Sequence, residues 1–219
     1  MNSPAEARLR PVLRDIHHWW FGTLASPAAF PADRKDIWFT QSDATDAYIL
    51  EHFTRHIAEA AAIDWDLDAL TREEQVALVI LLDQFSRNSF RGLPKAFAQD
   101  SKAREIAGRL LNREPSRFAL IERMFIAMPF EHSEAIADQN RSVALMAAIA
   151  VEASESFPDY AQWALDSFIA HRDVIRRFGR FPHRNKALSR DSMPEEQAFL
   201  DGLGNLNPSN PTERHRPSR

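Results

Sequence analysis

The segment from His171 to Arg190, HRDVIRRFGRFPHRNKALSR, concentrates residues that could bind an anion. It contains seven arginine or lysine residues and one acid, Asp173, so its formal charge is +6 in a chain whose total is −4. A guanidinium group keeps its charge at physiological pH and forms paired hydrogen bonds to a carboxylate or phosphate. The segment therefore predicts a site for an anionic small molecule or for an acidic segment of a partner protein.

A second segment carries the opposite charge. It contains Glu131, Glu134 and Asp138, and no lysine or arginine lies between Pro129 and Asn140, which gives a formal charge of −3. We expect these acids at positions i, i+3 and i+7 of one helix, and therefore on one face of it. The simplest interpretation is that the two segments meet and neutralise each other, which leaves a surplus of positive charge for a ligand.

Polar residues also end the most apolar helix of the chain, EEQVALVILLDQFSRNSF. We expect this helix to start with a capping box of Thr71 and Glu74 and to lie at the centre of the fold. An acid and a base four residues apart, Asp83 and Arg87, are in the favourable order for an intrahelical ion pair. Gln84, Asn88 and Arg91 share a second stripe, and polar groups at the end of a buried helix need partners. The predicted ligand-binding residues are Gln84, Arg87, Asn88, Arg91, Arg177, Arg180, Arg184 and Asn185.

Three residues are candidates for proton transfer: Glu131, His132 and His183. A histidine or a positioned carboxylate is the usual general acid or base, so these residues allow a hydrolase acting on an anionic substrate. The sequence has no glycine-rich phosphate loop and no Gly-x-Ser-x-Gly motif. The residues leave open whether the protein is an enzyme.

We expect neither a metal ion nor a cofactor. A metal site from Glu131, His132, Glu134 and His171 would resemble the carboxylate sites of helical bundles, but those repeat Glu-x-x-His, which is absent here. The sequence has no cysteine, which excludes disulfides and thiolate ligands.

The elements that position these residues are predicted to be helices only. Glycine occurs six times, apolar residues recur at helical spacing, and prolines mark the breaks. We predict a single all-α domain over residues 1–202, with about eight helices in antiparallel pairs, and a disordered tail over 203–219. The expected helices are Ala5–Trp20, Asp43–Ala62, Glu73–Phe90, Ser101–Asn112, one after Pro115, one from Ser133 to Ala153, Tyr160–Phe178 and one from a capping box at Ser192–Glu195 to Asp201. We expect a loop over residues 26–39, which Trp38 and Phe39 anchor to the core. Asp43 is the expected N-cap of the second helix, Pro129 is expected to interrupt the helix after Pro115, and Gly179 suits the left-handed position after Phe178.

Charge and hydropathy exclude several classes of partner. A net charge of −4 and a pI near 6.1 argue against a nucleic-acid-binding protein. The N-terminus lacks the apolar core of a secretory signal, and the longest apolar run, Val143 to Val151, is too short for a membrane span. We therefore expect a cytoplasmic protein with no membrane partner.

Several longer motifs resemble a known bacterial family, domain of unknown function 924. They are LLDQFSRNSFRG (81–92), AFAQDSKA (96–103), ERMFIAMPFEHSE (122–134), DQNRSVAL (138–145) and HRDVIRRFGRFPHRN (171–185), and the resemblance runs from about Val12 to Leu200. It implies a tetratricopeptide-like α-α superhelix and no assigned activity. Two hypotheses follow: a helical scaffold whose Arg/His/Glu-lined cleft binds an anion, and a hydrolase. In a third interpretation the charges only hold the helices together.

Overall fold

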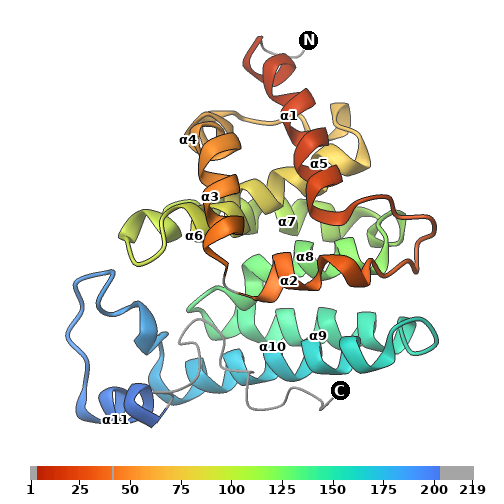
Figure 1. Ribbon diagram of the computed structural model, residues 1–219. Helices are drawn as coiled ribbons and strands as arrows, with labels where there is room; N and C mark the ends of the chain where they lie inside the picture. The colour runs from red at the N-terminus through yellow and green to blue at the C-terminus, as the bar shows by residue number, and fades with distance from the viewer. Residues whose placement is uncertain (1–3, 41, 203–219) are drawn as a thin grey trace. The chain divides into compact units, whose positions relative to one another are not determined.

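The computed structural model describes residues 4–40 and 42–202, and within them every regular element is helical (Figure 1). The prediction of an all-α protein is confirmed. The helices α1–α11 amount to ten, because α5 and α6 are joined into one by a π-helical turn, η3. The expected number of about eight was too low, mainly because one predicted helix is broken and one predicted loop contains a short helix. The predicted tail lies outside the described residues.

The chain divides into two compact units. Unit 1 comprises Met1–Arg91 and Lys95–Pro129, and unit 2 comprises Gly92–Pro94 and Phe130–Arg219. Each unit is described by itself below. The single domain over residues 1–202 and the superhelical arrangement of the helices stay predictions.

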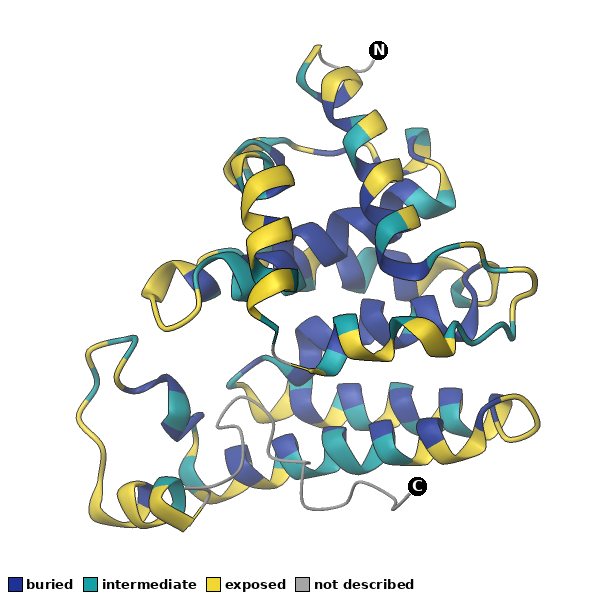
Figure 2. Cartoon of the chain, viewed as in Figure 1, coloured by how far each residue is buried: buried dark blue, intermediate teal, exposed yellow. Residues whose placement is uncertain are grey.

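Unit 1 is built around α5, which packs along α1 and continues through η3 into α6 (Figure 1). Figure 2 shows α5 as the most deeply buried helix of this unit, and every residue from Glu74 to Asp83 is buried. The prediction that this apolar segment is central is therefore confirmed. The helices are α1 (Pro4–Phe21), α2 (Lys35–Phe39), α3 (Asp43–His52), α4 (Thr54–Ala62), α5 (Arg72–Ile80), η3 (Leu81–Phe85), α6 (Ser86–Ser89), α7 (Asp100–Arg113) and α8 (Leu120–Glu131), whose last two residues belong to unit 2.

Aromatic side chains fill the core of unit 1. The ring of Phe125 lies 5.5 Å from that of Trp20, 5.4 Å from that of Phe21 and 5.1 Å from that of Trp38, each in an edge-to-face arrangement. The indole nitrogen of Trp38 donates to the backbone oxygen of Trp20 at 2.9 Å. This bond anchors the segment after α1 to the core, as the aromatic residues of that segment predicted.

The helix starts in unit 1 follow local hydrogen-bonding rules. Thr71 and Glu74 form the predicted capping box at the start of α5, each side chain bonding to the other's backbone. The helix predicted to run from Asp43 to Ala62 is instead two helices, since the backbone leaves the helical conformation at Phe53. Its N-cap is Ser42, whose hydroxyl oxygen accepts from the backbone of Thr45, and not Asp43.

Unit 2 contains an antiparallel helix pair, α9 (Ile136–Glu152) and α10 (Pro158–Phe178), which lie side by side (Figure 1). As predicted, α10 ends at Gly179, which adopts the left-handed conformation with φ 71°. The chain then forms a short turn, η6 (Pro182–Arg184), and a last helix, α11 (Pro194–Gly202). The cap of α11 is made by Glu196, whose carboxylate accepts from the backbone of Met193, and not by the predicted residues 192–195.

The prediction that three acids share one helix face is wrong. Glu131 is the last residue of α8, Glu134 lies in the following loop, and Asp138 belongs to α9. The loop forms because the hydroxyl oxygen of Ser133 accepts from the backbone nitrogen of Ala135, which delays the next helix to residue 136. The helical count i, i+3, i+7 therefore does not apply. Proline 129, expected to interrupt α8, lies within it.

Candidate functional site

A buried carboxylate–histidine pair lies in unit 2. Nδ1 of His171, on α10, is 2.9 Å from Oε1 of Glu131 and 2.9 Å from the backbone oxygen of Ser167. The Ser167 hydroxyl donates to the same Glu131 oxygen at 3.2 Å. Ser167 and His171 are four residues apart, so one helix face presents both to the end of α8. The sequence suggested Glu131 and the adjacent His132 for proton transfer, whereas the structure places His171 against the Glu131 carboxylate.

Burial and charge act in opposite directions on His171. Burial lowers its pKa, but the Glu131 carboxylate, its hydrogen bond and the Ser167 carbonyl together raise the pKa above the ordinary 6.5. The Tyr160 hydroxyl lies in the same field: burial, and then the charge of Glu131, raise its pKa well above 10. The charge of Glu131 therefore favours the protonated forms of both His171 and Tyr160.

This pair makes the stability of the protein depend on pH. Because the pKa of His171 is raised on folding, its contribution is fully present below pH 6.5 and is lost as the pH rises through the folded-state pKa. We expect the difference in free energy of unfolding between wild type and His171→Gln to shrink from about pH 6 to pH 9 in urea titrations. His18→Gln, at an exposed position of α1, should show no such trend. A constant difference for His171→Gln would contradict the coupling.

Glu134 holds the loop after α10 in place. Its two carboxylate oxygens accept from both terminal nitrogens of Arg190, at 2.8 and 2.9 Å, and Oε1 also accepts from the backbone nitrogen of Phe181 at 2.8 Å. Burial raises the pKa of Glu134, but the bonds from Arg190 and Phe181 outweigh it and lower the pKa. The predicted meeting of the acidic and basic segments thus takes place within unit 2, through this forked ion pair.

Arg180 and Asn185 share a second carboxylate. Arg180 donates to both oxygens of Glu196, from Nε at 2.6 Å and from Nη2 at 2.8 Å, and Asn185 donates to Oε2 at 3.1 Å. The hydrogen bond from Arg180 is the main reason that the pKa of Glu196 falls to about 2. Both predicted ligand-binding residues therefore hold α11 against the preceding loop.

The other predicted residues of unit 2 differ in exposure. Arg184 is buried, stacks 4.5 Å from the ring of Phe181 and donates to the backbone oxygen of His132 at 2.8 Å. His183 is half-buried, with its ring 5.4 Å from that of Phe181. Arg177 is exposed, and its guanidinium group lies 4.6 Å from the ring of Phe178.

The predicted polar stripe belongs to unit 1, where its members contact acids of that unit. Arg87 donates to Asp83 at 2.8 Å, the predicted intrahelical pair, and to Asp100 at 3.0 Å. The amide of Gln84 also donates to Asp83. A third acid, Asp46, is shared: Asn88 donates to it at 2.7 Å and Arg91 donates to both of its oxygens at 3.0 Å. The ligand-binding role of these four residues stays a prediction.

Comparison with known proteins places the chain in a family. A model of the family described as Bacterial protein of unknown function (DUF924) matches residues 16–204. The chain belongs to this family. Its structure is similar to that of a protein of unknown function, ATU0120, from Agrobacterium tumefaciens, with a TM-score of 0.70 and 31% sequence identity over 90% of this chain and 98% of that chain. No curated protein matches the sequence.

Three further contacts of buried carboxylates in this DUF924 chain were not predicted from the sequence. In unit 1, His17 lies 2.7 Å from Glu122, and the carboxylate of Glu74 binds both Arg10 and Arg14. Each pair joins residues at least 60 positions apart, so no local spacing indicates it.

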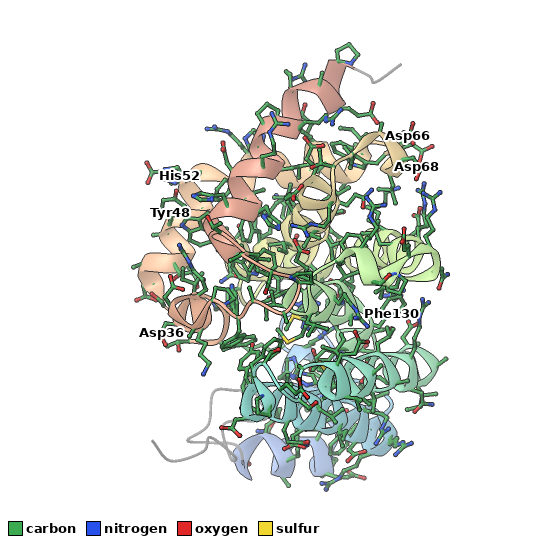
Figure 3. The ribbon with its side chains drawn as sticks, turned by 90° about the vertical axis from the view of Figure 1, so that its right-hand side faces the viewer. Asp36, Tyr48, His52, Asp66, Asp68 and Phe130 are labelled. Atoms are coloured by element: carbon green, nitrogen blue, oxygen red, sulfur yellow. The ribbon has the colours of Figure 1, made fainter. Side chains whose placement is uncertain are left out.

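The exposed His52 of unit 1 forms a ring contact. His52 lies beside Tyr48 on α3 (Figure 3), with the two rings 4.1 Å apart and stacked, and Trp19 stacks on Tyr48 at 4.8 Å.

Within residues 4–40 and 42–202, no three His, Cys, Asp or Glu residues are grouped so that they could hold a metal ion. None of the helices in the described part of the chain is long and apolar enough to span a membrane.

Proposed function

We propose that this helical protein binds a small anionic molecule at two exposed cations of unit 2, Arg177 in the last turn of α10 and Lys186 after it. The main support for this proposal is a surplus of positive charge. Arg177 and Lys186 are both exposed, and neither has a carboxylate within ion-pair distance among the described residues. The neighbouring arginines have such partners: Arg172 and Arg176 contact Asp173, Arg180 contacts Glu196, and Arg190 contacts Glu134.

The environment of Arg177 supports binding of an anion. Its guanidinium group lies 4.6 Å from the ring of Phe178 and 5.9 Å from that of Phe199. Such stacking limits the motion of the side chain but uses none of its hydrogen-bond donors. A carboxylate or phosphate group from solvent could therefore accept hydrogen bonds from an ordered guanidinium group whose donors are available. A cytoplasmic location, where such metabolites are abundant, is part of the proposal.

Inorganic phosphate tests the proposal. At about ten times the dissociation constant, phosphate should stabilise the protein by about 1.4 kcal/mol, which is a rise in Tm of about 3–5 °C over chloride at equal ionic strength. The double variant Arg177→Ala/Lys186→Ala should lose this rise, whereas Arg109→Ala, on α7 of unit 1, should keep it. Equal phosphate responses of the double variant and the wild type would refute the site.

The same experiment separates two sources of the anion. An acidic segment of a partner protein presents carboxylates to the same cations, so a short glutamate-rich peptide is added in a parallel arm. Binding of phosphate without the peptide supports a small-molecule site. Binding of the peptide without phosphate would overturn the small-molecule proposal in favour of the acidic partner segment.

A second candidate function is a hydrolase acting on an anionic substrate. The observation that favours it is the buried Glu131–His171 pair, since a histidine oriented by a carboxylate is a common general base. Glu131, His132 and His183 are the residues that the sequence suggested for proton transfer. Of these, Glu131 is the one whose carboxylate orients an imidazole in the structure.

A further inference from the structure

The hydrogen bonds of His171 determine which of its ring nitrogens carries the proton. Both neighbours of Nδ1, the Glu131 carboxylate and the Ser167 carbonyl, are acceptors. Nδ1 must therefore be the donor, and in the neutral imidazole the lone pair is on Nε2. Among the described residues Nε2 has no hydrogen-bond partner, and the side chain is 11% exposed. The structure thus fixes Nδ1 of His171 as a hydrogen-bond donor and leaves the lone pair of Nε2 available to accept a proton.

We propose that His171 is the general base of a hydrolytic site in unit 2, that Nε2 is its reactive atom, and that the substrate is an ester of a small anionic molecule. Glu131 is the positioning residue, because it acts on the substrate only through the imidazole. The anionic character of the substrate rests on the binding function proposed above. No step needs a metal or a redox cofactor.

The proposed step conserves atoms and charge. Nε2 accepts a proton from water as the water oxygen attacks the ester carbonyl carbon. The bond from that carbon to the alcohol oxygen then breaks, and the imidazolium returns the proton to the leaving oxygen. The products are the carboxylic acid and the alcohol, and His171 is again neutral with its proton on Nδ1.

The groups around His171 suit this role. Glu131, from α8, stabilises the imidazolium that forms, and burial of the pair strengthens that interaction. The buried Arg184, from η6, opposes protonation of His171 through its own charge. The ring of Phe181 packs edge-on against the imidazole at 5.6 Å and fixes its plane. Tyr160, on the same helix as His171, is kept protonated by burial and by the charge of Glu131.

Nitrogen NMR of the wild-type protein tests the tautomer without any substrate. At a pH above the pKa of His171, its resonances should show the proton on Nδ1 and an unprotonated Nε2. This form is the minor tautomer of free histidine, so its presence reports the Glu131 and Ser167 contacts. A proton on Nε2 in the neutral form would overturn the proposal, even if every variant failed to fold.

Ester hydrolysis tests the chemistry in the full chain. The wild type should hydrolyse 4-acetoxybenzoate with a rate that rises with pH through a pKa above 6.5. His171→Gln should lower the rate about a hundredfold, as loss of a general base does, whereas His52→Gln, in unit 1, should not. Glu131→Gln should move the midpoint of the pH profile downward, an effect that a purely structural role would not produce. Equal rates for His171→Gln and wild type would overturn the proposal.

The neutral ester methyl 4-acetoxybenzoate distinguishes the two proposals. Faster hydrolysis of the charged ester than of the neutral one would support both the anion site and the general base, provided that Arg177→Ala/Lys186→Ala loses this preference. If the two esters are hydrolysed at equal rates and both rates depend on His171, the anion site is refuted and the role of His171 as general base is supported. If phosphate raises Tm but no hydrolysis depends on His171, the anion site is supported and the role of His171 as general base is refuted.

Discussion

Replacement of Glu122 by alanine is expected to lower the free energy of unfolding by about 3–5 kcal/mol. The Glu122 carboxylate is fully buried in unit 1, where it lies 2.7 Å from Nε2 of His17 and accepts from the backbone nitrogen of Ala119 at 2.7 Å. Arg72 approaches the same carboxylate to 3.6 Å. The alanine variant would leave these donors without their acceptor in a site that water does not reach, and the desolvation of each is then uncompensated.

Urea unfolding of the whole chain measures this loss. Glu122→Gln keeps the shape and one oxygen acceptor, so it should cost less than the alanine variant. The matched control is Glu114→Ala, at an exposed position between α7 and η5, where a change within about 0.5 kcal/mol is expected. A loss for Glu122→Ala no larger than that of the control would show that the buried pair contributes nothing to stability.

Phe125→Ala is expected to cost a similar amount, about 3–5 kcal/mol, for a different reason. The Phe125 side chain is 1% exposed and contacts the rings of Trp20, Phe21 and Trp38. Truncation removes the apolar surface and the ring contacts together, and the surrounding indole groups are too large and too tightly packed to close the cavity.

The same urea titrations check this prediction. Phe125→Leu retains most of the buried volume and should lose less than the alanine variant. Leu50→Ala, where the leucine is 56% exposed on α3, is the control and should change the free energy of unfolding by about 0.5 kcal/mol or less. If Phe125→Ala matched Leu50→Ala, the aromatic cluster would not be the core of unit 1.

The helices themselves could be predicted from the sequence, because their signals lie within a few residues of each other. The capping box of Thr71 and Glu74, the central apolar helix α5 and the left-handed Gly179 after α10 were all correctly expected. The ion pair between Asp83 and Arg87 was also correctly expected, since a spacing of four residues in a helix brings the two side chains together. Where a local signal was ambiguous, as at Asp43, the N-cap was misplaced by one residue.

The candidate site is different, because its contacts join distant parts of the chain. The sequence determined that the protein is all-helical, that it carries a basic segment over residues 171–190, and that this segment has more positive charge than Glu131, Glu134 and Asp138 can neutralise. The tertiary structure alone decided that Arg180 pairs with Glu196, that Arg190 pairs with Glu134, and that His171 pairs with Glu131. Residue types fix which groups attract each other, but only the packing of the helices fixes which of them come within hydrogen-bonding distance.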